Sequence, residues 1–245
     1  MRIAFDLDGV LADLHTPFVQ AATQLFPELD PGRVRAQDIG ASPPDDEDVK
    51  PSDTDVPPPQ LQDVPMSSAQ MDKVWRYLGG IENFWESLSE IENGAIARLA
   101  KVADERRWEV LFITSRPKSD GRTVQRQSQR WLERFGFPLP SLYVVHGSRG
   151  QVASALRLDV VIDDRPDNCL DVVLESKAGA ILVWRGDRAG VPASARRLGI
   201  AVAGTVAESI DAIIEAERLD TGGTLLDRLR LLFGLRTRPS ILRRG

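Results

Sequence analysis

Two aspartates, Asp6 and Asp8, stand one residue apart at the end of the first apolar run of the chain. Large apolar side chains alternate with smaller neighbours over residues 2–7, and Gly9 follows, which predicts a short β-strand. Because side chains alternate along a strand, both carboxyl groups should point to the same side where the strand ends. Two carboxylates that converge there repel each other unless a cation or a catalytic role accompanies them. Taken alone they fit an acidic turn equally well, since Asp and Gly both favour turns.

Polar side chains also end two later apolar runs. Thr114 and Ser115 follow the run at 110–113, and Asp163 and Asp164 follow the run at 160–162. Strands of four to six apolar residues separated by helical segments predict an α/β fold, a doubly wound Rossmann-like parallel sheet. In such sheets ligands bind at the carboxyl ends of the strands. The three polar strand ends therefore predict one active site.

Other segments with periodically spaced apolar residues predict the helices and strands around this core. Helical spacing of apolar residues occurs in 17–26, 67–89, 95–107, 120–135, 150–156 and 205–219, and further strands are predicted at 142–145 and 180–184. We predict a core of residues 1–13 and 94–219 with a small inserted helical cap of residues 14–93. Residues 41–65 contain seven of the sixteen prolines and an acidic cluster, so we predict a disordered loop there.

The overall composition is that of a soluble globular protein. It is 42% hydrophobic and 27% charged, and the net charge of −5 gives no reason to expect a nucleic acid polymer as partner. Cys169 is the only cysteine, so an internal disulfide is excluded and a reducing compartment fits. The first strand begins beside Met1, and no apolar run approaches the roughly 20 residues that span a bilayer. We expect a cytoplasmic protein.

The last 26 residues, 220–245, form a basic amphipathic tail. They contain six arginines and two aspartates, a formal charge of +4. A basic amphipathic helix can lie on a membrane surface or bind a partner protein. We favour the simpler interpretation, in which its apolar face packs on the parent domain.

Three segments resemble motifs of the haloacid dehalogenase (HAD) superfamily of phosphohydrolases. Residues 5–10, 113–117 and 161–166 read FDLDGV, ITSRP and VIDDRP and resemble its first, second and fourth motifs. The spacing and the position of the cap are most similar to the 5′-nucleotidase branch, particularly the deoxyribonucleotidases. The resemblance implies a Mg²⁺-dependent phosphomonoester hydrolase that forms an aspartyl-phosphate. A small phosphorylated metabolite, in particular a nucleoside monophosphate, would be its substrate.

The resemblance implies a role for each acidic strand end. Asp6 would be the nucleophile, and Asp8 the general acid and then the general base. Mg²⁺, a hard cation that prefers oxygen ligands, would bind the Asp6 carboxylate, the Asp8 backbone carbonyl and the pair Asp163 and Asp164. Adjacent strand residues point to opposite faces, so one member of that pair should touch the metal directly. The resemblance favours Asp164.

The expected phosphate contacts depart from the family at one point. Thr114 or Ser115 would hydrogen-bond a phosphoryl oxygen. The family has a lysine before the acidic pair, whereas residues 119–163 contain none. Arg149 stands at the nearest matching position, and Lys118 matches a phosphate-contacting lysine of the deoxyribonucleotidase branch. Arginine is not a conservative replacement, because its planar fork is larger than an ammonium group.

Two aromatic residues of the cap, Phe84 and Trp85, are candidates for stacking on a base, as cap aromatics do in similar nucleotidases. Their helical spacing also fits a place in the core. Three functions are compatible with the sequence: a nucleotidase, a phosphatase for another small metabolite, and a catalytically weakened phosphate-binding protein. Intact Asp6 and Asp8 favour the enzymes, because a binding protein needs neither a nucleophile nor its acid.

Overall fold

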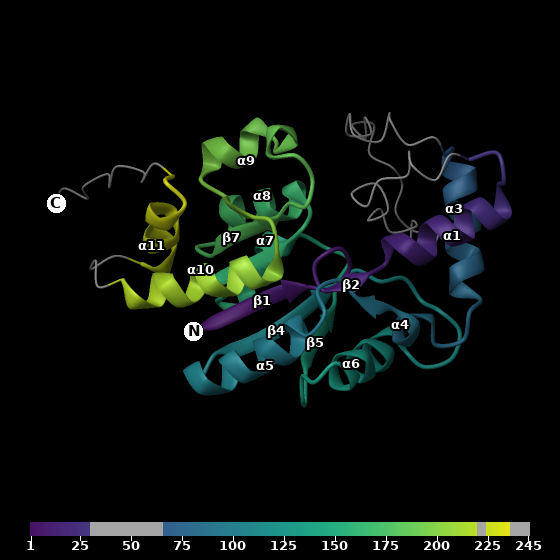
Figure 1. Cartoon of the computed structure of the whole chain (residues 1–245), viewed down its shortest axis with the longest axis horizontal. Coiled ribbons are helices and arrows are strands. Elements are labelled where there is room, and N and C mark those ends of the chain that lie inside the picture. The colour runs from purple at the N-terminus through teal and green to yellow at the C-terminus, as the bar shows by residue number, and fades with distance from the viewer. Residues whose placement is uncertain (30–65, 220–223, 236–245) are drawn as a thin grey trace. The chain divides into compact units, whose positions relative to one another are not determined.

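The computed structural model describes residues 1–29, 66–219 and 224–235, and its main feature is a six-stranded sheet (Figure 1). The strand order is β5-β4-β1-β6-β7-β8, and β1/β6, β6/β7 and β7/β8 pair in parallel. The strands are β1 Arg2–Asp6, β4 Glu109–Thr114, β5 Ser141–Val144, β6 Val160–Asp163, β7 Gly179–Val183 and β8 Ala201–Ala203. The predicted α/β Rossmann-like parallel sheet is confirmed.

Helices alternate with these strands along the chain. They are α1 His15–Leu25, α3 Ser68–Gly79, α4 Phe84–Ser87, α5 Ala95–Arg106, α6 Val124–Arg134, α7 Arg149–Leu156, α8 Pro166–Glu175, η3 Arg188–Gly190, α9 Ala193–Leu198, α10 Val206–Arg218 and α11 Leu225–Leu232. Every residue of β6 and β7 is buried, the pattern of strands covered on both faces. The sequence pattern does not predict β8, α8 or α9. Of these, β8 and α9 span only three and six residues, and runs this short show little periodicity.

The contacts of the chain divide it into two compact units. Unit 1 comprises Met1–Asp6, Lys101–Leu111 and Gly147–Gly245, and unit 2 comprises Leu7–Ala100 and Phe112–His146. Unit 2 thus combines the segment that we expected to be a cap with residues around β5 and α6. The predicted division into core and cap stays a prediction.

In unit 1, α7 packs closely on α8, which lies against β6 and β7. Gly150 of α7 permits this approach, since a Cβ there would lie 2.2 Å from the carbonyl oxygen of Asp171 on α8. Ser148 caps α7 by accepting hydrogen bonds from the backbone N–H groups of Gly150 and Gln151, and its hydroxyl donates to Glu175 of α8. The first turn of α7 is therefore fixed on α8.

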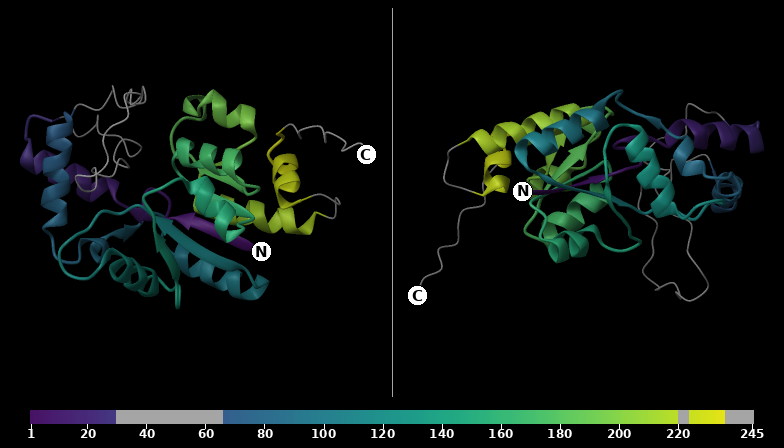
Figure 2. Two further views of the ribbon diagram at one scale, coloured as in Figure 1. Left: turned by 180° about the vertical axis from the view of Figure 1, so that it is seen from behind. Right: turned by 90° about the horizontal axis from the view of Figure 1, so that it is seen from below.

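The described part of the tail packs on unit 1. Figure 2 shows α11 beside α10 from two further directions. Arg228 of α11 donates hydrogen bonds to the carbonyl oxygens of Ala216 (3.1 Å) and Leu219 (3.3 Å) at the end of α10, and Leu229 is 2% exposed. Residues 220–223 and 236–245 of the tail lie outside the described residues. Within the described ranges, no helix has the length and apolar character needed to cross a bilayer.

In unit 2, the segment that interrupts the alternation of strands and helices begins and ends at a small ladder. β2 (Ala12–Asp13) pairs antiparallel with β3 (Ser89–Glu90), and Ile91 N donates to Leu11 O at 2.9 Å. Between these strands, α1 packs on α3. The segment therefore leaves and returns at one place, as an insertion does. The loop predicted at 41–65 lies outside the described residues.

The prediction of one helical stretch over 67–89 is wrong in its middle. α3 ends at Gly79, Gly80 follows, and α4 begins only after Asn83, whose φ of 54° is left-handed. Consecutive glycines favour a helix end because they gain more backbone freedom outside the helix than other residues do. The apolar spacing continues through this break and therefore hides it.

A buried amide, Gln127 of α6, joins the loop after β4 to α4 within unit 2. Its Oε1 accepts hydrogen bonds from Trp85 N (3.1 Å) and from Ser119 Oγ (3.2 Å), and its Nε2 donates to Arg122 O. Trp85 Nε1 also donates to Pro117 O at 3.0 Å. The loop and α4 are therefore held together by several bonds at once.

Candidate active site

Asp6 ends β1 in unit 1, and its carboxylate is paired with Arg149. Nη2 of Arg149 lies 3.0 Å from Oδ1 of Asp6, and Nε of Arg149 lies 3.8 Å from Oδ2 of Asp163 at the end of β6. The three side chains are at most 10% exposed. One guanidinium therefore lies between two buried carboxylates. Arg149 is one of the two cations that the sequence offered in place of the family's lysine.

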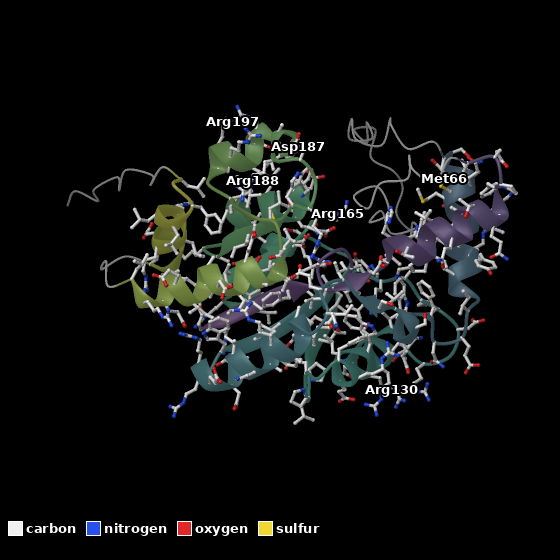
Figure 3. The ribbon with its side chains drawn as sticks, in the orientation of Figure 1. Met66, Arg130, Arg165, Asp187, Arg188 and Arg197 are labelled. Atoms are coloured by element: carbon white, nitrogen blue, oxygen red, sulfur yellow. The ribbon has the colours of Figure 1, made fainter. Side chains whose placement is uncertain are left out.

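Asp163 is held by the turn that leads from β6 into α8. Its Oδ1 accepts a hydrogen bond from the backbone N–H of Arg165 at 2.8 Å, and both oxygens accept from Nδ2 of Asn168, at 3.1 and 2.9 Å. Figure 3 labels Arg165 in this turn. Burial raises the pKa of Asp163, and the charge of Arg149 acts in the opposite direction. Donors from the protein thus already surround this carboxyl group.

Asp164 is half-buried, whereas Asp163 is fully buried, and the pKa of Asp164 lies well above its ordinary value. Burial, together with the negative charge of Asp163, raises the pKa of Asp164 to about 8. Burial also raises the pKa of the Cys169 thiol, and the charges of Asp163, Asp164 and Asp6 add to this effect. Burial at this end of unit 1 therefore acts against the ionised forms of Asp164 and Cys169.

The donors of unit 1 fit a hard divalent cation. Among the described residues, no three His, Cys, Asp or Glu side chains already form a metal-binding group. Mg²⁺ does not need one, since it is usually held by one or two carboxylates and keeps several waters. The parallel pairing of β1 with β6, with Phe5 opposite Ile162, supports the fit, because Asp6 and the acidic pair 163–164 then follow neighbouring strands at one edge of the sheet.

In unit 2, Asp8 forms an ion pair with Arg116. Nε of Arg116 lies 3.0 Å from Oδ1 and 2.8 Å from Oδ2, and Nη2 lies 2.8 Å from Oδ1. Thr114 Oγ1 lies 3.4 Å from Asp8 Oδ2 and accepts a hydrogen bond from Arg116 N at 3.3 Å. The structure thus brings together Asp8 and Thr114, two of the predicted site residues, through an arginine that we did not predict.

The other predicted residues of unit 2 lie in different surroundings. Ser115 is half-buried beside Thr114, and the side chain of Lys118 is exposed. Phe84 and Trp85 are 3% and 1% exposed, and their ring centroids are 4.9 Å apart. Such low exposure fits the place in the core that their helical spacing also allowed. Stacking of a base on either ring stays a prediction.

Sequence reasoning missed two polar partners of the aspartates. Arg116 lies inside the ITSRP motif, but a sequence does not show whether an arginine after a strand turns inward or towards solvent. Asn168 follows Asp163 by five residues, at the start of α8, where an Asn side chain can reach back to the preceding strand end. The contact of Asn168 is local, whereas that of Arg116 joins residues 108 positions apart and depends on the fold.

No family model and no curated protein matches this sequence. The fold, in contrast, is shared with solved structures of hydrolases. A HAD family hydrolase from Deinococcus radiodurans R1, solved with bound phosphate and sodium, gives a TM-score of 0.54 at 20% identity, over 89% of this chain and 97% of that one. A hydrolase from Pseudomonas syringae gives a TM-score of 0.51 at 16% identity, over 88% and 99%. At these identities the likeness establishes the fold: the chain has the α/β fold of HAD-type hydrolases.

Proposed function

We propose that this protein is a Mg²⁺-dependent phosphomonoester hydrolase that forms an aspartyl-phosphate on Asp6. The observation that carries the proposal is the ion pair of Arg149 with Asp6 beside Asp163 in unit 1. A carboxylate nucleophile and a phosphate dianion repel each other, and a fixed cation offsets this repulsion. The three sequence motifs and the fold of HAD-type hydrolases support the same assignment.

The proposed reaction has two steps. First, an oxygen of Asp6 attacks phosphorus in line, the ester P–O bond breaks, and Asp8 gives its proton to the leaving alcohol. Second, Asp8 takes a proton from a water whose oxygen attacks phosphorus, and the bond between phosphorus and Asp6 breaks. Only Leu7 separates the two aspartates, so their Cα atoms lie within about 7 Å of each other.

The remaining predicted residues would bind the phosphate and the metal. Asp6, Asp164 and the backbone carbonyl of Asp8 would hold Mg²⁺, and Asp163 would orient waters or neighbouring groups. When bound, the ion would neutralise part of the phosphate charge. Thr114 or Ser115 would donate a hydrogen bond to a phosphoryl oxygen, and Arg149 would supply the positive charge of the missing lysine. Exposed Lys118 is a second candidate for that charge.

The proposed substrate is a nucleoside monophosphate, on the strength of the motifs that resemble the 5′-nucleotidase branch, and the proposed location is the cytoplasm. The low exposure of Phe84 and Trp85 weakens the base-stacking support for this substrate. It therefore favours a second candidate, a phosphatase for another small phosphorylated metabolite. A catalytically weakened phosphate-binding protein is the third, because an arginine replaces the usual lysine.

A substrate screen separates these candidates. Phosphate release is measured from ribo- and deoxyribonucleotides, sugar phosphates and 4-nitrophenyl phosphate, with Mg²⁺ and with a chelator. We expect Mg²⁺-dependent turnover that Asp6→Asn lowers at least about 10³-fold, as loss of a catalytic nucleophile does. Preference for nucleotides supports the first candidate and preference for other esters the second. Equal release by wild type and Asp6→Asn would rule out the enzymatic proposal.

A further inference from the structure

Arg116 in unit 2 is a buried charge for which the proposed reaction has so far no use. Its side chain is 0% exposed, whereas the side chain of Asp8, its partner, is 18% exposed. The guanidinium is therefore shielded from solvent, whereas part of the carboxylate side chain is exposed. A guanidinium without exposed surface does not reach a phosphate directly, so any role of Arg116 in the reaction passes through Asp8.

The contacts of Arg116 with Asp8 restrict how the carboxylate is oriented. Three N···O distances of 2.8 to 3.0 Å join the fork of Arg116 to both oxygens of Asp8. Bidentate pairing of this kind fixes the plane of a carboxylate as well as its position, which a point charge such as an ammonium group does not. Thr114 Oγ1, 3.4 Å from Asp8 Oδ2, adds a further polar neighbour.

The guanidinium of Arg116 is itself held from the other side. Its Nη1 donates to Ser128 Oγ at 2.8 Å, and its Cζ lies 4.8 Å from the ring centroid of Trp85 and 5.6 Å from that of Trp131. Both indoles are anchored by their N–H groups, to Pro117 O at 3.0 Å and to Leu88 O at 2.8 Å. α4 and α6 thus form a rigid support for the arginine within unit 2.

Stability alone is a weak reason for such an arrangement. Removing two charges from water costs free energy, and replacing a buried ion pair with apolar residues of similar volume is often neutral or stabilising. A general acid, in contrast, needs its carboxyl group held in a fixed orientation towards the leaving oxygen. The geometry of the pair suits this second requirement.

We propose that Arg116 is a positioning residue that orients Asp8 for proton transfer to the leaving alcohol. The inference rests on the proposed function and adds to it a residue that contacts neither substrate nor metal. Trp85, Trp131 and Ser128 support the arginine. Trp85 of α4 and Trp131 of α6 would thereby contribute to proton transfer through the arginine.

The test compares two leaving groups on the same enzyme preparation. An alkyl phosphate, the best one in the substrate screen, needs a proton on its leaving oxygen, whereas 4-nitrophenyl phosphate releases a stable anion without one. The value of kcat/KM covers the steps up to release of the alcohol, so the second, hydrolytic step does not enter it. The ratio of the two values is also independent of the fraction of correctly folded protein.

Arg116→Lys keeps the charge and loses the fork. We expect its kcat/KM to fall about 10- to 100-fold for the alkyl ester, within the range of general acid catalysis, and by no more than about threefold for the nitrophenyl ester. Asp8→Asn should shift the ratio in the same direction. Arg130→Lys is the matched control, since Arg130 also lies in unit 2 but is exposed and pairs with Glu86. Its ratio should equal that of the wild type.

Two results overturn the inference and can be told apart. Equal losses for both esters in Arg116→Lys, from an active wild type, show that the arginine has a structural role only, and leave the proposed function intact. An inactive wild type in Mg²⁺ overturns the proposed function and this inference with it.

Discussion

At the scale of single residues, Arg149 balances the negative charge at the candidate site of unit 1. Replacing it with methionine leaves Asp6 and Asp163 buried without their shared cation. We expect Arg149→Met to lose about 3–5 kcal/mol of unfolding free energy, the usual cost of removing one partner from a buried pair. Arg149→Lys keeps the charge and should retain more stability and more activity. Urea unfolding measures the first effect, and an unchanged midpoint in Arg149→Met would contradict it.

The raised pKa of Asp164 predicts how the free energy of unfolding depends on pH when no metal is bound. Its pKa is about 8 in the folded protein, against 3.8 for an ordinary Asp. Between these values the folded protein holds a proton that the unfolded chain has lost. The contribution of Asp164 to the free energy of unfolding is therefore fully present below the lower pKa. It falls as pH rises towards about 8, by at most about 1.4 kcal/mol per pH unit.

The measurement is urea unfolding in a chelator at several pH values, with Asp164→Asn as the control that cannot titrate. The wild type should lose stability more steeply than the variant as pH rises through this window. Parallel curves for the two proteins would show that Asp164 titrates in its ordinary range. Added Mg²⁺ should reduce the difference, because a cation favours the ionised carboxyl group.

At the scale of elements, the close packing of α7 on α8 determines where Arg149 lies. A Cβ at position 150 would meet the carbonyl oxygen of Asp171 at 2.2 Å, so Gly150→Ala forces α7 away from α8. We expect a loss of about 1–3 kcal/mol, as for other overpacked sites. Turnover should fall as well, because Arg149 moves with the helix.

Gly147→Ala is the matched control for this prediction. It also adds one methyl group just before α7, but no heavy atom lies within 4 Å of the added Cβ. Thermal unfolding and kcat/KM of both variants provide the comparison. If Gly150→Ala resembles Gly147→Ala in both measurements, the contact between the helices does not determine the position of Arg149.

The sequence predicted the strands better than the contacts of the polar side chains. β1, β4 and β6 are apolar runs whose ends carry Asp6, Thr114 and Asp163, so composition along a few residues is enough to locate them. The break between α3 and α4 is harder to predict from the sequence, because the apolar spacing continues across it. The pairing of Asp8 with Arg116 joins residues 108 positions apart, and only the folded chain brings them together.

At the scale of the whole molecule, α11 is expected to add to the stability of unit 1. Leu229 is buried, and Arg228 binds carbonyl oxygens at the end of α10. A chain that ends at Leu219 should lose at least about 2 kcal/mol of unfolding free energy, the value of one buried leucine. A chain that ends at Leu235 keeps these contacts and is the control. Equal stability of the two shortened chains would contradict this role.

The bonds of Gln127 have a consequence for engineering and for evolution. Because one amide binds both Trp85 in α4 and the loop that follows β4, these two stretches are not independent modules. A chimera that imports α4 from another protein without the matching loop and Gln127 would leave buried donors and acceptors unpaired. Exchanges at this end of unit 2 should therefore succeed only when residues 79–88 and 115–127 are inherited together.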